Sequence, residues 1–334
     1  MSSRMFRVAA LSLALGFASQ ARAAELPLPR DGWASWQVEA VEDAPAWCCW
    51  SNGYDQTTSP VCQLDGDKHG YGSRDNAKTD AVRMYARFKD GKIERLRSLS
   101  ASCPAQAETP IQQLDAVATD DSARWLIGLT KQTPAQPALR GDFAEDVLAA
   151  LAMHRGTLAF DALSGLARND VQVETRKHAI FWLAVMRGAA GADVVSAAMF
   201  NDKVADVRKH ASFAITQSRS PRVAADLIRL GNSDLEGDVR SQAWFWLAHS
   251  GAPAAEEAIV AASKRDQDDN VREKAVFALS QLPDARATRA LIAAAEDKSL
   301  SREQRKQAVF WLAQSKSTDA QLYLEKVLVG NTAR

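Results

Sequence analysis

Four cysteines are the residues of this sequence whose chemistry is easiest to name. They lie in the first third of the chain, at Cys48, Cys49, Cys62 and Cys103. Thiols can carry redox chemistry, but the C-x-x-C spacing that usually tunes a reactive thiol does not occur. In an exported chain an even number of cysteines predicts two disulfides. Three pairings are open, and we expect Cys48 and Cys49 each to reach a distant partner, because a disulfide between adjacent residues is strained.

The beginning of the chain predicts export. Arg4 and Arg7 form a positive segment, residues 8–18 are apolar but too short to span a bilayer, and residues 21–23 (Ala-Arg-Ala) fit a signal-peptide cleavage site. We therefore expect residues 1–23 to be a signal peptide cleaved after Ala23, and the mature protein to be periplasmic. No other apolar run approaches membrane length, which predicts no membrane insertion.

The charge of the chain gives no indication of a nucleic-acid partner. The full sequence has 41 basic and 41 acidic residues. Removal of the three arginines in residues 1–23 leaves 38 basic and 41 acidic residues, a net charge of −3. Proteins that bind nucleic acid concentrate positive charge, so we expect no such partner here.

A short block of residues recurs five times in the second half of the chain. Examples are RKHAIFWLAVM, RSQAWFWLAHS and RKQAVFWLAQS. The first residue of each block is an arginine, and these arginines are spaced by 32, 32, 32 and 33 residues: Arg176, Arg208, Arg240, Arg272 and Arg305. An alanine follows three residues later and a phenylalanine five residues later in every block. A fixed repeat of this length is the signature of a solenoid.

The residue pattern within each repeat predicts two helices. Apolar residues lie at positions −1, +3, +6 and +7 from the arginine, which is helical spacing. Turn residues follow, and then a second apolar helix such as residues 223–231. Neither helix can bury its apolar face alone, so neighbouring repeats must stack. With a degenerate first unit near residue 142, we expect about six repeats over residues 142–334.

The repeats resemble a known family. Asp206-Val207-Arg208, followed by an Ala-rich amphipathic helix and a second short helix, is similar to a HEAT repeat, and the 32-residue unit resembles the short type named after phycobilisome lyases. The resemblance implies a mainly α fold, an α-solenoid. It also implies a structural arginine ladder, in which the repeated arginines bond to acidic side chains and carbonyls of neighbouring turns.

The repeated phenylalanines are the candidate binding residues. On a helical wheel, position +5 points away from the apolar positions. This places five aromatic rings in a row, bordered by polar side chains: Phe181, Phe213, Phe245, Phe277 and Phe310, with His210, Gln242, Gln281 and Gln314. An exposed apolar stripe with a polar rim is typical of an interaction surface. The alternative is that neighbouring helices or the N-terminal region cover the rings.

The region before the repeats has a different character. Residues 24–108 contain alternating segments and a hairpin signal at Asp90-Gly91, which predict a small disulfide-bonded β domain. Residues 109–141 predict one helix and a Pro-containing linker. The aromatic residues of the β domain would either stack on a sugar or form a small core around the disulfides; they are Trp33, Trp36, Trp50, Tyr54 and Tyr71.

No pattern in the sequence indicates an enzyme. Some short HEAT-repeat proteins are iron-dependent hydroxylases with repeated His-Glu pairs, but none of the five histidines here is followed by glutamate. His178 and His210 occupy equivalent positions in adjacent repeats, about 10 Å apart, which is too far for one metal ion. No P-loop, G-x-S-x-G or H-E-x-x-H motif occurs. We therefore expect no catalytic residue, metal or cofactor.

The sequence as a whole predicts a periplasmic scaffold or adaptor that binds a protein or peptide of the cell envelope on the solenoid surface. Two alternatives stay open at this point. One is an envelope enzyme, or an enzyme accessory, whose chemistry uses the cysteines or a site across repeats. The other is cell-wall carbohydrate binding by the N-terminal aromatic residues. The sequence does not indicate which solenoid face binds or the oligomeric state.

Overall fold

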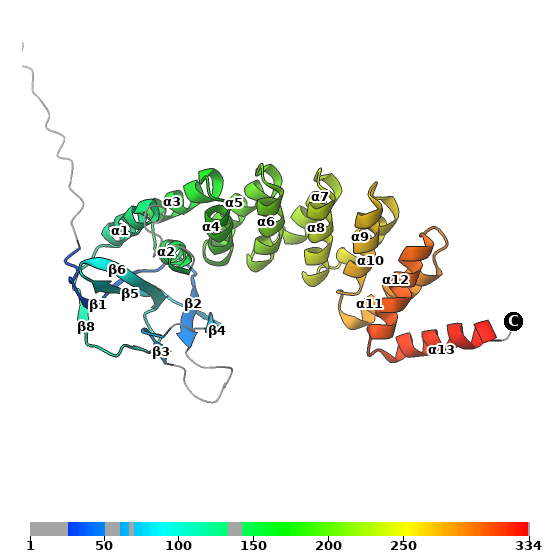
Figure 1. Cartoon of the computed structure of the whole chain (residues 1–334), viewed down its shortest axis with the longest axis horizontal. Helices are drawn as coiled ribbons and strands as arrows, with labels where there is room; N and C mark the ends of the chain where they lie inside the picture. The colour runs from blue at the N-terminus through cyan, green and yellow to red at the C-terminus, as the bar shows by residue number, and fades with distance from the viewer. Residues whose placement is uncertain (1–25, 51–60, 67–69, 133–141, 333–334) are drawn as a thin grey trace, which may run out of the picture.

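The computed structural model describes residues 26–50, 61–66, 70–132 and 142–332. The predicted signal peptide lies outside this part of the chain. A small sheet region is followed by a long row of helices (Figure 1). The predicted fold class is confirmed: the chain is mainly α, an α-solenoid of two-helix repeats preceded by a small disulfide-bonded β region.

The β region contains one main sheet and two short strand pairs. The main sheet has the order β6-β5-β1-β8, with β6 at Lys92–Ser100, β5 at Ala81–Lys89, β1 at Gly32–Glu39 and β8 at Ile111–Gln113. The predicted hairpin joins β5 to β6, and Asp90 and Gly91 both have positive φ at its turn. Strand β8 pairs in parallel with β1, so the sheet continues beyond the boundary expected at residue 108.

The other two strand pairs carry three of the four cysteines, and Cys103 lies in the turn after β6. The two pairs are β2 (Pro45–Trp50) with β4 (Gly70–Lys78), and β3 (Cys62–Gln63) with β7 (Ala105–Gln106). Cys48 is bonded to Cys103 and Cys49 to Cys62, so each adjacent cysteine reaches a distant partner, as predicted. All four are buried, and none is free.

The first two tryptophans of the β region are buried and do not form an exposed binding surface. Trp33 is 1% exposed and packs in the small core around the disulfides, and Trp36 is also 1% exposed. Of the two alternatives left open for the aromatic residues of the β domain, burial is what the structure shows for Trp33 and Trp36, since hydrophobic packing and indole hydrogen bonds use both rings. The side chains of Trp50 and Tyr71, and the whole of Tyr54, lie outside the described residues.

The opposite face of the sheet packs against the first two helices, α1 (Thr119–Gln132) and α2 (Asp142–Met153). Trp36, Val38 and Met84 belong to the same continuous hydrophobic core as the apolar residues of the repeats. The β region is thus joined to the solenoid through a shared core.

Six helix pairs follow one another along the solenoid, beginning with α2 and ending with α13. Their remaining members are α3 (Thr157–Asn169), α4 (Val173–Met186), α5 (Gly188–Asn201), α6 (Ala205–Gln217), α7 (Val223–Ser233), α8 (Gly237–His249), α9 (Ala255–Arg265), α10 (Asp269–Leu279), α11 (Asp284–Glu296), α12 (Arg302–Gln314) and α13 (Thr318–Thr332). The even-numbered helices α4 to α12 carry the repeated arginine and phenylalanine.

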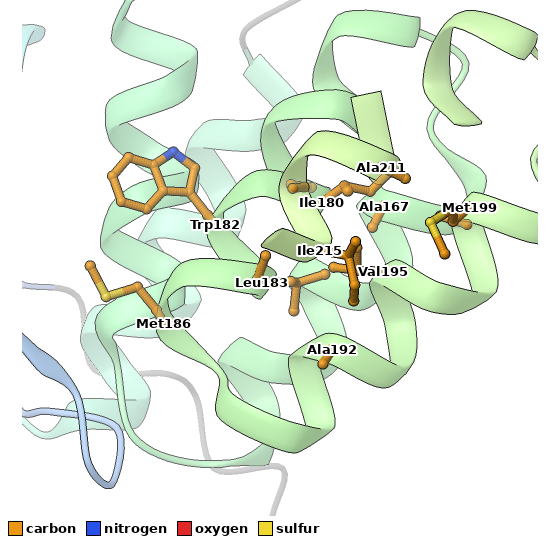
Figure 2. Close-up of a cluster of buried hydrophobic side chains, with 14 of the residues drawn as sticks. Ala167, Ile180, Trp182, Leu183, Met186, Ala192, Val195, Met199, Ala211 and Ile215 are labelled. Carbon is orange, nitrogen blue, oxygen red and sulfur yellow. The ribbon is translucent and has the colours of Figure 1, made fainter. Parts of the chain in front are cut away.

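The core runs between the two helical layers. Ile180 and Leu183 of α4 meet Val195 of α5 and Ile215 of α6 (Figure 2). We call the even-numbered member of each pair its first helix and the odd-numbered member its second helix. First helices of neighbouring pairs contact one another more extensively than the second helices do. The repeated small residue explains this close approach, because it is fully buried in every repeat: Ala179, Ala211, Ala243, Ala275 and Ala308.

A buried chain of hydrogen bonds links strand β1 of the sheet to helices α1 and α2. Trp36 Nε1 donates to Ser122 Oγ at 2.8 Å, and the Ser122 hydroxyl lies 2.8 Å from His154 Nε2. His154 Nδ1 lies 2.6 Å from the Ala150 carbonyl, so a neutral ring that carries its proton on Nδ1 satisfies every partner. Ser122 and His154 are both fully buried, which leaves no access for a substrate to this Ser-His pair.

Arg187 extends this network to the α4–α5 turn. Its guanidinium group donates to the carbonyls of Leu151 and His154 at 2.6 and 2.7 Å, at the C-terminal end of α2. Burial lowers the pKa of Arg187 to about 10. The arginine therefore faces His154 as a buried positive charge, and it opposes protonation of the imidazole.

We expect His154 to make stability depend on pH. Burial, with a smaller contribution from Arg187, lowers its pKa from 6.5 to about 4. The folded state favours the neutral ring, so this stability is fully present above pH 6.5 and is lost as the pH falls toward 4, by up to about 3 kcal/mol. The measurement is the free energy of urea unfolding from pH 7.5 to 4.

The matched comparison is His154→Gln, with His249→Gln as a control at an exposed histidine. Acidic residues titrate alike in all three proteins, so the difference in slope isolates His154. His154→Gln should be less stable at neutral pH and should lose less stability on acidification. Equal slopes for wild type and His154→Gln would show that the imidazole does not control this window.

Candidate interaction surface

The repeated arginines fix the spacing of the repeats. Arg176, Arg208 and Arg240 each bind both carboxylate oxygens of the aspartate that follows the second helix of their own repeat. The partners are Asp202, Asp234 and Asp266, with N–O distances from 2.7 to 3.2 Å. These carboxylates also accept a hydrogen bond from the backbone two residues later. Each arginine therefore holds the turn that leads into the next repeat.

Each of these arginines also reaches back to the preceding turn. Nη1 of Arg176, Arg208 and Arg240 donates to the carbonyl six residues earlier, at 2.7, 3.0 and 2.9 Å. The arginine–carboxylate contact raises the pKa of Arg208 and of Arg240, because the hydrogen bond stabilises the charged form. One guanidinium group thus connects two successive turns, and the three together form a ladder along the stack.

The ladder changes in the last two repeats. The residue 26 positions after Arg272 is Lys298, where the earlier repeats have aspartate. Arg272 pairs instead with Asp269 of its own helix and donates to the Asp266 carbonyl at 2.5 Å. Arg305 donates to the Leu300 carbonyl. The implied ladder thus has its full geometry at three of the five arginines.

We expect loss of Arg240, which binds an aspartate in the arginine ladder, to cost more than loss of Arg272 in the fifth helix pair. Arg240→Met leaves the Asp266 carboxylate, 7% exposed, without its partner and should destabilise the fold by about 3 kcal/mol. Arg272→Met removes a pair with an exposed aspartate and should cost about 1 kcal/mol or less. Urea unfolding followed by circular dichroism compares the two variants. Equal losses would contradict a structural role specific to the carboxylate clamp.

Aromatic side chains form a continuous row along the first helices, which we call the aromatic ladder. Each ring lies 4.9 to 6.0 Å from the next, between ring centroids. In spatial order the members are Trp47, Trp182, Phe181, Phe213, Trp246, Phe245, Phe277, Trp311 and Phe310. All five phenylalanines of the predicted stripe are brought together in this row.

The alternation of tryptophan and alanine at position +6 sets the spacing of the rings. Ala214 lies in the repeat before Trp246, and this tryptophan packs against Phe213 at 4.9 Å. The same arrangement recurs two repeats later, where Trp311 lies 4.9 Å from Phe277. The intervening phenylalanines stack almost parallel, at interplanar angles of 12° and 15°. The ladder therefore has a period of two repeats.

The exposure of the ladder changes along its length. At the N-terminal end Trp47 of β2 covers Trp182, which is 5% exposed. The middle phenylalanines are half-buried by their neighbours. Phe310, at the C-terminal end, is 54% exposed. Neighbouring rings thus cover the ladder in part over most of its length, and its C-terminal end is the most exposed.

The predicted rim residues lie at different depths. His210 is half-buried, 5.9 Å from the Phe213 ring, and burial lowers its pKa. Gln242 is half-buried, Gln281 donates to Ser280 Oγ at 2.9 Å, and Gln314 is exposed. His249, which was not among the candidate residues, lies 4.4 Å from the Phe245 ring.

Sequence reasoning missed the tryptophans as members of this surface. The repeat pattern assigned position +6 to core packing, yet Trp246 and Trp311 are only half-buried and complete the ladder. The indole Nε1 atoms of Trp182, Trp246 and Trp311 are buried without a hydrogen-bond partner. The alternation with alanine was the sequence signal that could have placed these rings beside the phenylalanines.

Within the described residues, no group of three or more histidine, cysteine, aspartate or glutamate side chains could hold a metal ion. No described helix has both the length and the apolar character needed to cross a membrane.

Comparison with protein families supports the repeat architecture directly. The family description of HEAT repeats matches residues 232–313. Residues 232–313 are thus similar to HEAT repeats. The matched segment contains helices α8 to α11 and most of α12, which carry three of the five repeated arginines. The C-terminal part of the aromatic ladder, from Phe245 to Phe310, lies within this match.

Three solved structures are similar to part of this chain, at low sequence identity. Human deoxyhypusine hydroxylase, in complex with glycerol, is 14% identical with a TM-score of 0.27, over 61% of this chain and 77% of that chain. The protein YibA of Escherichia coli is 18% identical with a TM-score of 0.36, over 63% and 80%. A computationally designed cyclic homo-oligomer is 17% identical with a TM-score of 0.14, over 64% and 81%. No curated protein sequence matched the chain.

Proposed function

We propose that this protein is a periplasmic interaction scaffold that binds a protein or peptide of the cell envelope on its aromatic ladder. The observation that carries the proposal is the continuity of the ladder across five repeats, with Phe310 exposed at its open end. The proposal concerns binding and assigns no reaction to the chain.

The ladder has the physical properties of a binding surface. Aromatic side chains dominate the energetics of protein interfaces, because they bury a large area and lose little conformational freedom. Here neighbouring rings hold one another in place before a partner arrives. A preformed surface of this kind avoids much of the ordering cost of association, which favours binding.

Polar groups beside the ladder would give the contact its specificity. Lys177 of α4 bonds to Asp206 of α6 at 3.1 Å, and Lys274 of α10 bonds to Asp238 of α8 at 2.8 Å. These pairs connect adjacent first helices and keep their mutual position. The amides of Gln242, Gln281 and Gln314 and the imidazole of His249 can both donate and accept hydrogen bonds, as a peptide backbone requires.

Two features support the periplasmic part of the proposal. One is the predicted signal peptide of residues 1–23. The other is the pair of buried disulfides, which form and persist in oxidising compartments. We assign residues 24–108 a role at the N-terminal end of the solenoid, where Trp47 closes the ladder.

The alternative of cysteine-based chemistry has little support in the fold. All four cysteines are in disulfides, and their exposures range from 0% to 6%. A thiolate must be accessible to act as a nucleophile or redox centre. The disulfides instead staple β2 to the turn after β6 and to β3, which is a structural role.

Substitutions along the ladder test the proposal. We expect Phe310→Ala to weaken partner capture by roughly tenfold or more, as loss of an interface anchor does, while costing the fold less than about 1 kcal/mol. The measurement is quantitative affinity capture from periplasmic extract with the wild type and the variant as baits. Thermal unfolding of each bait is measured in parallel.

Leu235→Ala is the matched control, because Leu235 is an apolar side chain 92% exposed, in the turn before α8 and outside the ladder. Proteins retained by the wild type and by Leu235→Ala, but lost with Phe310→Ala, would support binding through the ladder. Equal retention by all three baits would contradict it. A large loss of stability in Phe310→Ala would return this ring to the core.

A further inference from the structure

The last helix pair, α12 and α13, leaves one end of the stack uncovered. Five large apolar side chains are exposed in the described part of the chain, and three of them lie on this pair: Phe310, Leu322 and Val327. At the opposite end, the main sheet and α1 pack on the first pair, α2 and α3 (Figure 1). The stack is therefore covered at its N-terminal end and open at its C-terminal end.

The open side of α12 consists of positions that earlier repeats bury. Four residues after the repeat arginine, the earlier first helices have side chains that are at most 1% exposed: Ile180, Ser212, Trp244 and Val276. The counterpart in α12, Val309, is half-buried. Eight residues after the arginine, Ala184 and Ala248 are buried and the residues of α6 and α10 are half-buried, whereas Ala313 is exposed. A further repeat packs on each of the earlier first helices, so these positions form the contact between repeats.

The second helix of the last pair shows the same difference. Nineteen residues after the repeat arginine, the earlier second helices have side chains that are at most 2% exposed: Val195, Leu227, Ile259 and Leu291. The counterpart in α13, Leu324, is half-buried. Three residues further on, the earlier side chains are at most 8% exposed, but Val327 is 37% exposed. The core between the two helical layers thus reaches the surface at a patch that we call the end face: Val309, Phe310, Ala313, Leu324 and Val327.

Segments of this chain outside the described residues do not account for the end face. Residues 1–23 are the predicted signal peptide, and residues 333 and 334 are too few to cover it. The longest internal segments, 51–60 and 133–141, join elements of the N-terminal part. Ten residues span at most about 36 Å, which is less than the roughly 50 Å from the first pair to the last.

We propose that the end face binds the end face of a second copy, in a two-fold, tail-to-tail dimer. The end face is one half of a contact between repeats, and it is complemented by another surface of the same kind. A head-to-tail arrangement would need the N-terminal side of the stack, which the sheet and α1 cover. The remaining complement is the end face itself, and a surface that pairs with its own copy forms a closed two-fold dimer.

The sequence of α12 is compatible with this arrangement. A two-fold axis that passes between Val309 and Phe310 makes the two α12 helices antiparallel, and each Phe310 then lies against Val309 of the second copy. The small side chain of Ala313 permits the helices to approach closely. The same register brings Glu303 to the level of Lys316 of the second copy, and both of these side chains are exposed. Apolar residues therefore meet at the centre, and opposite charges meet at the rim.

The size of the end face predicts a weak dimer. Helix α12 has 13 residues and is about 20 Å long, and two helices side by side are about 20 Å wide. A dimer therefore buries on the order of 1,000 Å² in total, at the lower end of specific interfaces. Self-association goes beyond the proposed partner binding, and Phe310 is the residue that the ladder and the end face share.

Analytical ultracentrifugation of the purified protein over a range of concentrations tests the proposal. We expect a reversible monomer–dimer equilibrium. Ala313→Arg should weaken it by about tenfold or more, because each arginine would be buried against apolar side chains without a partner. The matched control is Ala197→Arg, the same change at an exposed alanine of α5, and it should leave the equilibrium unchanged. Thermal unfolding of both variants checks that they remain folded.

A cysteine near the axis tests the two-fold geometry. The four native cysteines are all in disulfides, so Val309→Cys introduces a single free thiol. With diamide as the oxidant, we expect two copies of Val309→Cys to form an intermolecular disulfide, and Ala197→Cys to stay uncrosslinked. Charge reversal tests the register: Glu303→Lys and Lys316→Glu should each weaken the dimer, and the double variant should restore it.

Three results would overturn the proposal: a wild type that is monomeric at every concentration, a dimer that Ala313→Arg leaves unchanged, and no cross-link in Val309→Cys. A monomeric wild type whose Ala313→Arg variant loses an envelope protein in affinity capture would also overturn it, and would assign the end face to that protein. All of these variants retain Phe310. A monomeric wild type that still captures envelope proteins therefore contradicts the dimer and leaves the proposed function standing.

Discussion

Stacking of one repeat on the next is the constraint on which the structure depends. An isolated helix pair of this sequence cannot bury its apolar face, so each repeat is completed by its neighbours. A fully buried alanine at the same position in α4, α6, α8, α10 and α12 permits the close approach, and the bidentate contacts of Arg176, Arg208 and Arg240 fix its register. Because the register is the same in successive repeats, any other side chain at a fixed position also forms a row.

The aromatic ladder follows from this regularity. Position +5 points away from the core of its own repeat, and in a single helix pair the phenylalanine would be exposed. In the stack, the ring of the next repeat covers part of it, so that Phe181 lies on Phe213 and Phe245 on Phe277. The same contact stabilises the stack and also holds the rings in place for the partner that we propose. Structural and functional explanations of these residues therefore describe one arrangement.

Most of the solenoid could be predicted from the sequence, because its information is local and repeated. The arginine spacing predicted the number and the phase of the repeats, and the even number of cysteines, with the predicted export, led us to expect two disulfides. What could not be predicted depends on contacts between distant segments. Burial of Trp33 and Trp36, the contact of Trp47 with Trp182, and the Trp36–Ser122–His154 network each join residues far apart in the chain. The break of the arginine ladder at Arg272 could have been predicted from the sequence, since Lys298 occupies the position of the expected aspartate.

Small-angle X-ray scattering of the monomeric protein, separated by size exclusion, distinguishes an extended stack of repeats from a compact globule. Six repeats stacked about 10 Å apart extend for roughly 60 Å, and the β region adds to this length. The account predicts a radius of gyration of roughly 25 Å or more and a skewed pair-distance distribution, because the first helices lie in a row. A radius near the roughly 20 Å of a compact globule of this length, with a symmetric distribution, would contradict it.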